Sequence, residues 1–391
     1  MKFIHTGDLH LGMEPDKDRP WSKTRARELW DTFANIIEMC RKNRPDLLLI
    51  AGDLFHRQPL VRELKEVNAQ FASIDSTKVV LIAGNHDYIG GTSEYSSFKW
   101  AENVYFITSD KPDSIYFEDI DTEIYGFSYH TRDIFEPLLK GLKPEDPSRI
   151  NILLGHGGEA SKLPVDFMEL ARAGFDYVAM GHLHKPIDIA DNIRYCGSPE
   201  PLDRNETGVH GIIVGSVENS LRTETAADER AVDPGSVKTT MSNDSHGYEK
   251  ITKTQRISTA ARQYIRAVLD IGPDDTNLSL RGRMRELVEN GGENNFYTIT
   301  LRGEHDPEIV FDLDGLGEQG LITDIFDETR PLLDFDRLER ENKGNVIGLY
   351  IEKLRGADGT DPETAGITEK ALYYGVMALT GRSLVNENKK R

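Results

Sequence analysis

Five short motifs in the first half of the chain carry the residue types that hold divalent cations. They lie at Asp8-Leu9-His10, Gly52-Asp53, Gly84-Asn85-His86-Asp87, Gly155-His156 and Gly181-His182-Leu183-His184. Carboxylate and amide oxygens mixed with imidazole nitrogens suit manganese, iron or zinc better than magnesium, which prefers an all-oxygen shell. Two such ions about 3.5 to 4 Å apart can clamp a phosphate and activate a water molecule. The motifs therefore predict a two-metal site suited to phosphoester hydrolysis.

Each motif directly follows a short apolar run that is typical of a buried strand. The runs cover residues 3–4, 47–50, 79–82, 152–154 and 177–180. Helical apolar faces precede the second and third runs, at Leu29, Phe33, Ile36, Ile37 and Cys40, and at Leu60, Leu64, Val67, Phe71 and Ile74. Alternating strands and helices predict a layered α/β sheet, whose ligands gather beyond the carboxyl ends of the strands. We therefore expect all five motifs to meet at one edge.

Each motif taken alone has a simpler explanation. An Asp-x-His pair is more often a solvated turn, and Asn-His-Asp after a strand can be turn chemistry, because Asn and Asp bond their own backbone. His182 and His184 can share one face of an extended surface segment. The joint occurrence of all five motifs at strand ends favours a dimetal site. Four further histidines are left out of the site: His5, His130, His210 and His246.

The set of motifs resembles the calcineurin-like metallophosphoesterase superfamily. Residues 52–56 (Gly-Asp-Leu-Phe-His) and 197–203 (Gly-Ser-Pro-Glu-Pro-Leu-Asp) are similar to the nuclease subunit of bacterial SbcCD and its counterpart in double-strand-break repair. The resemblance extends to about residue 210 and covers the remainder poorly. It implies an α/β fold: a layered β-sandwich phosphoesterase core flanked by helices, with a smaller α+β C-terminal capping domain.

The resemblance also implies a set of metal ligands. One ion would be held by Asp8, His10 and His184, and the other by Asn85, His156 and His182. Asp53 would bridge the two ions, because a carboxylate between two cations lowers their repulsion and leaves room for a bridging hydroxide as nucleophile.

Three further side chains receive roles in catalysis, His86 and His56 from the same resemblance and Asp87 because histidines of metal sites usually need a partner that orients the ring. His86 would act as general acid or stabilise the leaving oxygen. Asp87 would orient the ring of His86 without binding metal itself. His56 occupies a position that lies near the scissile phosphate in the nuclease branch.

The implied activity is a manganese-favouring DNA phosphodiesterase that acts on ends as an exonuclease, with some endonuclease activity. Iron and zinc are the alternative ions. A phosphodiesterase or phosphatase for a small nucleotide or another phosphoester is the alternative among enzymes. A metal-bound scaffold with a vestigial site is the alternative outside them, and the presence of His86 argues against it.

The net charge of -19 is the main argument against a nucleic-acid substrate, because DNA-binding proteins usually present a basic face. Basic residues do cluster near the motif loops, at Lys17, Arg19, Lys23, Arg25, Arg27, Arg57, Arg62, Lys185 and Arg204. They are compatible with a weakly held DNA end. Equally, Arg25 and Arg27 can simply open a solvated helix.

The 391 residues divide by composition into four predicted segments. Residues 1–217 are expected to form the dimetal phosphoesterase domain, and the polar residues 218–258 a linker or long loop. Residues 259–335 are expected to form the capping domain, with strands over 264–271, 296–301, 309–311 and 321–326 and a helix that contains Leu280, Met284, Leu287 and Val288.

Residues 336–391 are expected to form a C-terminal helical segment with a stripe at Ile367, Ala371, Tyr374 and Ala378. The resemblance implies that such a helix docks on a coiled-coil ATPase of the SbcC type, and packing on its own domain is the alternative. Members of the resembled family are often homodimers, although no interface is legible in this sequence.

No stretch of about 18 apolar residues and no signal peptide is apparent, so we expect a cytoplasmic protein with no membrane span. The two cysteines, Cys40 and Cys196, argue against a disulfide framework.

Overall fold

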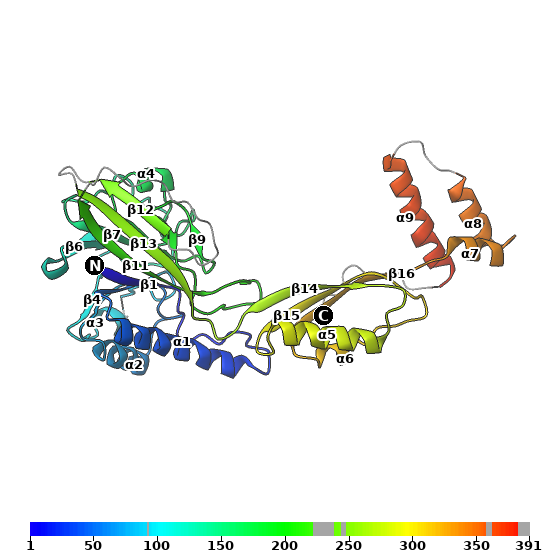
Figure 1. Ribbon diagram of the computed structural model, residues 1–391, viewed down its shortest axis with the longest axis horizontal. Helices are drawn as coiled ribbons and strands as arrows, with labels where there is room; N and C mark the ends of the chain where they lie inside the picture. Colours follow the sequence, from blue (N-terminus) through cyan, green and yellow to red (C-terminus); the bar gives the residue numbers. More distant parts are fainter. Residues whose placement is uncertain (92–93, 222–237, 244–247, 357–361, 382–391) are drawn as a thin grey trace. The chain divides into compact units, whose positions relative to one another are not determined.

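The computed structural model describes residues 1–91, 94–221, 238–243, 248–356 and 362–381. Its contacts divide the chain into two units, Met1–Gln263 and Tyr264–Arg391. Figure 1 labels many of the elements of both units.

In the described part of unit 1, two β-sheets are formed (Figure 1). The first has the strand order β12-β13-β11-β1-β2-β3-β4, with bounds β1 Lys2–Thr6, β2 Leu47–Ala51, β3 Lys78–Ile82, β4 Val104–Phe106, β11 Gly211–Leu221, β12 Lys238–Asn243 and β13 Tyr248–Ser258. The second has the order β5-β6-β7-β8-β10-β9, with bounds β5 Asp113–Phe117, β6 Thr122–Gly126, β7 Ile150–His156, β8 Tyr177–Gly181, β9 Ile187–Asp188 and β10 Ile193–Tyr195. Strands β1 to β4 run parallel, as do β6, β7, β8 and β10.

The two sheets pack face to face through apolar side chains. Leu49 and Val80 of the first sheet share a buried cluster with Ile152 and Ala179 of the second. Helices α1 (Ser22–Asn43) and α2 (Val61–Ala72) cover the outer face of the first sheet, where Phe33 joins a second cluster. Because both faces of β2 are covered, all of its residues are buried, which explains its uninterrupted run of leucines and isoleucine.

The outer face of the second sheet is covered by loops and by α4 (Phe167–Ala171), whose Leu170 packs with Leu153 and Val178. Two shorter elements complete unit 1, α3 (Glu94–Ser97) and the 3₁₀ turn η1 (Glu118–Ile120). Unit 1 is therefore a β-sandwich with helices outside, as the resemblance implied.

The five strands and two helices predicted before the motifs are confirmed, with one difference in their arrangement. The motifs follow strands of two sheets, because β1, β2 and β3 belong to the first and β7 and β8 to the second. His156 pairs with Gly181 at the ends of β7 and β8. The motifs thus do not share one sheet edge.

The linker predicted over residues 218–258 is wrong where the structure describes it. Strand β11 continues to Leu221, and β13 pairs with it antiparallel. The polar composition of β13 indicated a loop, but several of its polar residues are buried with partners. Lys250 forms an ion pair with Asp176 at 3.1 Å, and the Thr252 hydroxyl donates to the Asp176 carbonyl at 3.2 Å. Residues 222–237 and 244–247 of that predicted linker lie outside the described residues.

Unit 2 begins with three parallel strands in the order β14-β15-β16. The elements are β14 Tyr264–Ile271, α5 Asn277–Gly291, β15 Phe296–His305, α6 Leu313–Gly317 and β16 Leu321–Pro331. Helices α5 and α6 pack on this sheet through Leu280, Met284 and Leu316. The strand predicted over 309–311 does not form, because this segment leads into α6 and buries Phe311 in the same cluster.

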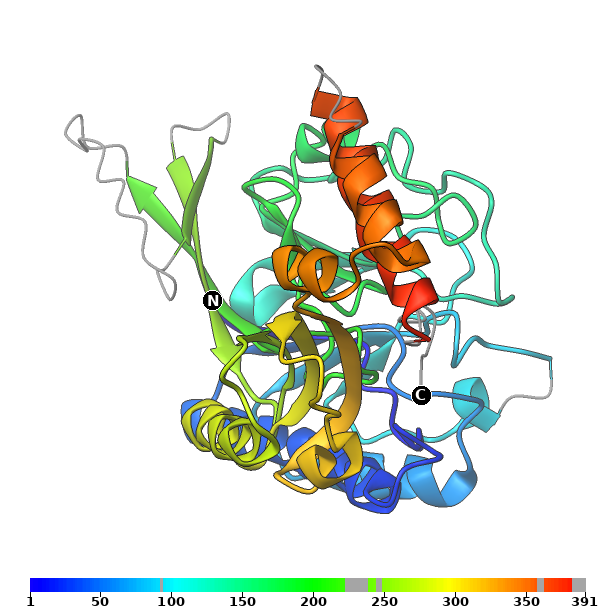
Figure 2. The same cartoon turned by 90° about the vertical axis from the view of Figure 1, so that its right-hand side faces the viewer.

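Three helices end the described chain: α7 (Phe335–Glu341), α8 (Val346–Arg355) and α9 (Pro362–Leu379). Ile351 of α8 packs with Leu372 and Val376 of α9, and the pair appears in orange and red in Figure 2. The predicted stripe on α9 faces outward instead, with Ile367 64% and Tyr374 45% exposed. No helix in the described part of the chain has the length and apolar character needed to cross a bilayer.

Candidate metal centre

In the loops after β1 and β2, three candidate ligands adopt the left-handed region of backbone conformation. The φ angles are 51° at Asp8, 46° at His10 and 49° at Asp53. Non-glycine residues adopt this region at a cost of about 1–3 kcal/mol each. The two loops stabilise one another, because the amide of Asp8 donates to the Gly52 carbonyl at 3.1 Å and that of His10 to the Asp53 carbonyl at 3.0 Å. Such strain is concentrated at functional sites.

Two glycines allow the motif loops to approach closely. A side chain at Gly84 would overlap the Asp53 carboxylate, and one at Gly181 would overlap the carbonyl oxygen of Ala51. Both positions need glycine because another backbone or ligand atom occupies the space of a Cβ.

Most of the predicted ligands converge in two adjacent groups. The donor atoms of Asp8, His10 and His184 lie within 4.8 Å of one another, and so do those of Asp8, Asp53 and His156. The Nε2 atoms of His10 and His184 are 3.1 Å apart. Asp53 Oδ2 lies 3.6 Å from His10 Nε2, in the first group, and 3.4 Å from His156 Nε2, in the second. Asp8 is thus common to both groups, and Asp53, a member of the second group, also lies close to His10 of the first.

The two remaining predicted ligands flank His156. Asn85 Oδ1 lies 3.0 Å from His156 Nε2. The ring of His182 packs edge-on against that of His156 at 5.2 Å between centroids, and His182 Nε2 lies 3.4 Å from the exposed Glu159. The His182 backbone amide also donates to both Asp8 oxygens, at 3.0 and 2.9 Å. The structure thus places His182 at the centre through its amide, and its ring is in neither donor group.

These residues fit divalent cations by their chemistry. Asp8 and Asp53 are at most 1% exposed, and two buried carboxylates with no cation between them are costly. Facing ring nitrogens that approach to 3.1 Å, beside carboxylate oxygens, form the mixed donor set that manganese, iron and zinc accept. The site is therefore suited to hold metal.

The ionisable groups of the site shift one another's pKa values. Burial, opposed by His156, raises the pKa of Asp8 to about 6. Burial also opposes ionisation of Asp53, but His156 and His10 hold the pKa of its carboxyl well below the usual range. Burial disfavours the charged form of His156, yet Asp53 raises its pKa to about 9. Each of these pKa values is thus set by burial together with a neighbouring ionisable group of the same site.

The tautomer of His156 is set by its second nitrogen. Nδ1 donates to the backbone carbonyl of Ala51 at 2.8 Å, so Nε2 is the atom that faces Asp53 and Asn85. A metal-ligating histidine usually donates its other ring N–H in this way.

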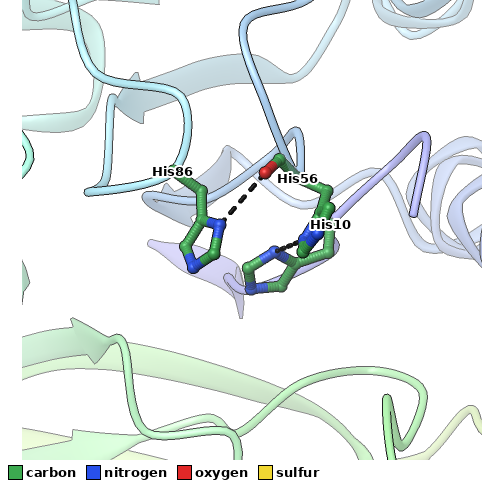
Figure 3. A group of neighbouring side chains, drawn as sticks. All are labelled: His10, His56 and His86. Atoms are coloured by element: carbon green, nitrogen blue, oxygen red, sulfur yellow. Dashed lines mark hydrogen bonds between the residues drawn. The ribbon is translucent and has the colours of Figure 1, made fainter. Parts of the chain in front are cut away.

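The buried His10 and the half-buried His56 and His86 at the rim of the site bring three imidazoles together, and their donor atoms form a third group within 4.8 Å of one another (Figure 3). His86 Nδ1 donates to the backbone carbonyl of His56 at 3.0 Å, and the two rings stack with centroids 5.0 Å apart. The Nδ1 atoms of His56 and His10 are 3.2 Å apart. The amide of His86 also donates to Asp53 Oδ1 at 2.8 Å. The predicted catalytic histidines therefore adjoin the metal centre and one another.

The expected role of Asp87 differs from what the structure shows. The carboxylate does not bond the His86 ring; it accepts from the amide of Gly84 at 2.7 Å and from that of Phe55 at 3.1 Å. It is fully buried, and burial together with Asp53 raises its pKa to about 7. Asp87 thus joins the two loops that carry His56 and His86.

One basic residue of the predicted DNA-contacting cluster is not on the surface. Arg25 is fully buried, pairs with Glu28 and Glu200, and donates to the Pro201 carbonyl at 2.6 Å. It neither opens a solvated helix nor reaches a substrate, but holds the loop after β10 against α1.

Sequence reasoning missed Glu206, whose Oε1 accepts from His184 Nδ1 at 2.6 Å. The signal was close at hand, because the motif at residues 197–203 ends three positions earlier. A glutamate in a polar loop has no periodicity that would indicate its partner.

Comparison with known proteins agrees with this geometry. Residues 1–186 match the family model described as calcineurin-like phosphoesterase. The chain is 30% identical over 246 residues to an uncharacterized metallophosphoesterase, YhaO, of Bacillus subtilis, covering 56% of this chain and 58% of the relative.

Two archaeal relatives are named DNA double-strand break repair protein Mre11. That of Methanocaldococcus jannaschii is 30% identical over 221 residues, covering 53% of this chain and 58% of the relative. That of Methanopyrus kandleri is 26% identical over 242 residues, covering 54% and 52%. The chain thus spans little more than half the length of each relative. The matched region contains all five motifs, and the amino-terminal half of this chain is a calcineurin-like metallophosphoesterase domain with Mre11-like relatives.

Proposed function

We propose that this chain is a DNA nuclease, an exonuclease with some endonuclease activity, that uses two divalent ions with manganese favoured. The observation that carries the proposal is the convergence of carboxylates and imidazoles from two sheets on two adjacent donor groups, with His56 and His86 beside them. That arrangement supports phosphodiester hydrolysis.

One ion would be held by Asp8, His10 and His184, which form the first donor group. The other would be held by Asn85, His156 and His182, with Asp53 shared because its carboxylate lies near both His10 and His156. The assignment of the His182 ring rests on the family resemblance. When bound, the ions would supply positive charge to the phosphate and lower the pKa of the attacking water.

His86 is proposed to give a proton to the leaving oxygen. Its Nδ1 is bound to the His56 carbonyl at 3.0 Å, which orients the ring and leaves Nε2 for the substrate. In the protonated ring, Nε2–H can pass its proton to the departing sugar oxygen. The hydrogen bond to the carbonyl persists in both protonation states, so the ring keeps its orientation through the reaction.

His56 is proposed to contact the phosphate through Nε2. If His10 offers Nε2 to an ion, its Nδ1 carries the proton and donates to His56 Nδ1, 3.2 Å away. The remaining proton of a neutral His56 then lies on Nε2. Such a donor can stabilise charge that develops on a phosphate oxygen.

The choice of DNA rests on the two Mre11 relatives and on the segment that ends in His56. The net charge of -19 favours a second candidate, a phosphodiesterase for a small nucleotide. The burial of Arg25 and the ion pair of Arg57 with Glu63 at 2.8 Å reduce the cations free to meet a DNA backbone. A substrate panel separates the candidates.

The test compares DNA with a small substrate in the same preparation. Metal-free protein is supplied with manganese and given blunt duplex, single-stranded DNA and a generic aryl phosphodiester, beside an Asp53→Asn control. The proposal predicts shortening of DNA from its ends by the wild type and none by Asp53→Asn. Hydrolysis of the aryl ester with both DNA substrates intact would overturn it in favour of the small-nucleotide enzyme.

A coiled-coil ATPase of the SbcC type is proposed as partner for the C-terminal helices. The outward face of α9, with Ile367 and Tyr374 exposed, supports docking there. An Ile367→Asp variant should lose binding to such an ATPase and keep hydrolysis of the aryl phosphodiester.

A further inference from the structure

We infer that Glu206 is a positioning residue that prepares His184 to bind metal, so that its loss weakens one ion of the pair selectively. The inference rests on the proposed function, because it needs His184 as a ligand. Glu206 Oε1 accepts from His184 Nδ1 at 2.6 Å, and His184 Nε2 lies in the donor group with Asp8 and His10.

The geometry of the pair determines the tautomer of His184. A carboxylate only accepts hydrogen bonds, so the proton must lie on Nδ1. In the neutral ring, which is the form that ligates a metal, Nε2 therefore presents its lone pair toward His10 Nε2, 3.1 Å away. A carboxylate partner also makes the ring more basic than a carbonyl partner would, which strengthens it as a ligand.

Glu206 is itself held in place on its other oxygen. Oε2 accepts from the amide of Leu202 at 2.7 Å and lies 3.5 Å from the Ser198 hydroxyl. His210 Nε2 lies 3.1 Å from the Glu206 carbonyl oxygen, and the amide of Ser198 donates to the His184 carbonyl at 2.9 Å. The side chain is 16% exposed. The carboxylate can therefore hardly turn away from His184.

The other histidines of the centre have different partners. His156 donates to a neutral carbonyl, and the Nδ1 of His10 meets another imidazole. His182 lies 3.4 Å from Glu159, whose side chain is 59% exposed. Among the described residues of the centre, His184 has the close carboxylate partner that is not itself a candidate ligand, so the effect of Glu206 should be confined to the ion that His184 holds.

The experiment measures manganese binding to metal-free full-length protein by calorimetry and by metal content after dialysis. Wild type should bind two ions. Glu206→Ala should weaken one of them by about 10- to 100-fold and leave the other unchanged. Glu206→Gln should weaken the same ion, because its amide can donate to Nδ1 and move the ring proton to Nε2, where it blocks the lone pair.

A matched control is Glu159→Ala, which removes an exposed carboxylate beside another candidate ligand and should change neither affinity by more than about twofold. Circular dichroism of the metal-free variants checks folding, and the isosteric Glu206→Gln carries the test if Glu206→Ala is unfolded. A double-mutant cycle then shows whether Glu206 acts by positioning the His184 ring or by stabilising the surrounding loop. In a His184→Ala background, Glu206→Ala should have no further effect on the remaining ion.

The outcomes distinguish the two proposals. If wild type binds two ions and both Glu206 variants bind them with wild-type affinity, the inference about Glu206 is overturned and the proposed function stands. An additional loss in the His184→Ala background also overturns it, since Glu206 would then act on the site by another route. If wild type itself binds fewer than two ions, the proposed function fails first.

Discussion

His86 is bound to the backbone of the other rim histidine, with Nδ1 3.0 Å from the carbonyl oxygen of His56 (Figure 3). A backbone partner cannot titrate, so the ring keeps its orientation over a wide range of pH. Neither residue needs to be a metal ligand for this pair to form. Because the orientation of the His86 ring does not depend on metal, substitutions of His86 can test catalysis and metal binding separately.

Replacing His86 should remove turnover without removing metal. His86→Ala is expected to lower kcat by about 100- to 10,000-fold, the usual contribution of a general acid. Manganese content should equal that of wild type, because both proposed ions lie in the donor groups that contain Asp8, and the group that His86 forms with His10 and His56 is proposed to hold neither. The exposed His130, which binds the Thr108 carbonyl, offers a control in His130→Ala, with activity unchanged. Wild-type turnover by His86→Ala would remove the assignment.

Asp87→Asn should reduce both stability and activity. The carboxylate accepts one backbone amide on each oxygen, from Gly84 and from Phe55, and an asparagine offers a single acceptor oxygen. One buried N–H then loses its partner, so the free energy of unfolding should fall by about 1–3 kcal/mol in urea titrations. The loops of His56 and His86 should separate and kcat should drop.

A matched control for Asp87 is Asp166→Asn at the exposed start of α4. Both amides there bond the same oxygen, Oδ1, so asparagine can replace the aspartate with little change in stability. Equal stability of Asp87→Asn and wild type would mean that the carboxylate does not join the two loops.

Metal binding should release protons and strengthen as the pH rises. Burial opposes charge on His184, but the carboxylates of Glu206 and Asp8 raise its pKa to about 9, and that of His156 is also about 9. Below pH 9 each ring must lose a proton to ligate, so manganese affinity should increase up to about pH 9 and then level off. Calorimetry in buffers of different ionisation enthalpy measures the release. Affinity that does not change between pH 6.5 and 8.5 would contradict these protonation states.

His5 should make unit 1 sensitive to acid. Burial lowers its pKa to about 3 from the ordinary 6.5, so the ring stays neutral in the folded protein. The unfolded chain takes up the proton first as the pH falls below 6.5, and stability is lost progressively down to pH 3. The variant His5→Gln cannot take up this proton. In the presence of a chelator, the difference in the free energy of unfolding between wild type and His5→Gln should therefore decrease by about 1 kcal/mol from pH 6 to pH 5.

The neighbouring buried Thr6 provides the comparison for His5. Thr6→Val changes a side chain that is 1% exposed and cannot titrate, so its effect on the free energy of unfolding should be the same at both pH values. If the difference in the free energy of unfolding between wild type and His5→Gln is also the same at both pH values, His5 does not take up a proton on unfolding.

The sequence by itself determined which segments form strands and which residue types follow those strands. Apolar runs such as 47–50 predict strands buried on both faces, and glycines beside Asp53 and His182 indicate close approach, because both signals are local in the chain. The helices α1 and α2 and most elements of unit 2 were predictable for the same reason. The metal-binding chemistry followed from the types of residue at strand ends.

Only the tertiary structure decided how distant segments share those residues. It joined motifs from two sheets, paired Glu206 with His184, gave Asp87 two backbone partners and buried Arg25 against Glu200. It also turned polar residues of the predicted linker into strand β13. Polar side chains are stabilised by partners that lie far away in sequence, and their own periodicity does not identify those partners. Only the folded packing brings Glu206, a glutamate in a loop, beside His184, a candidate metal ligand.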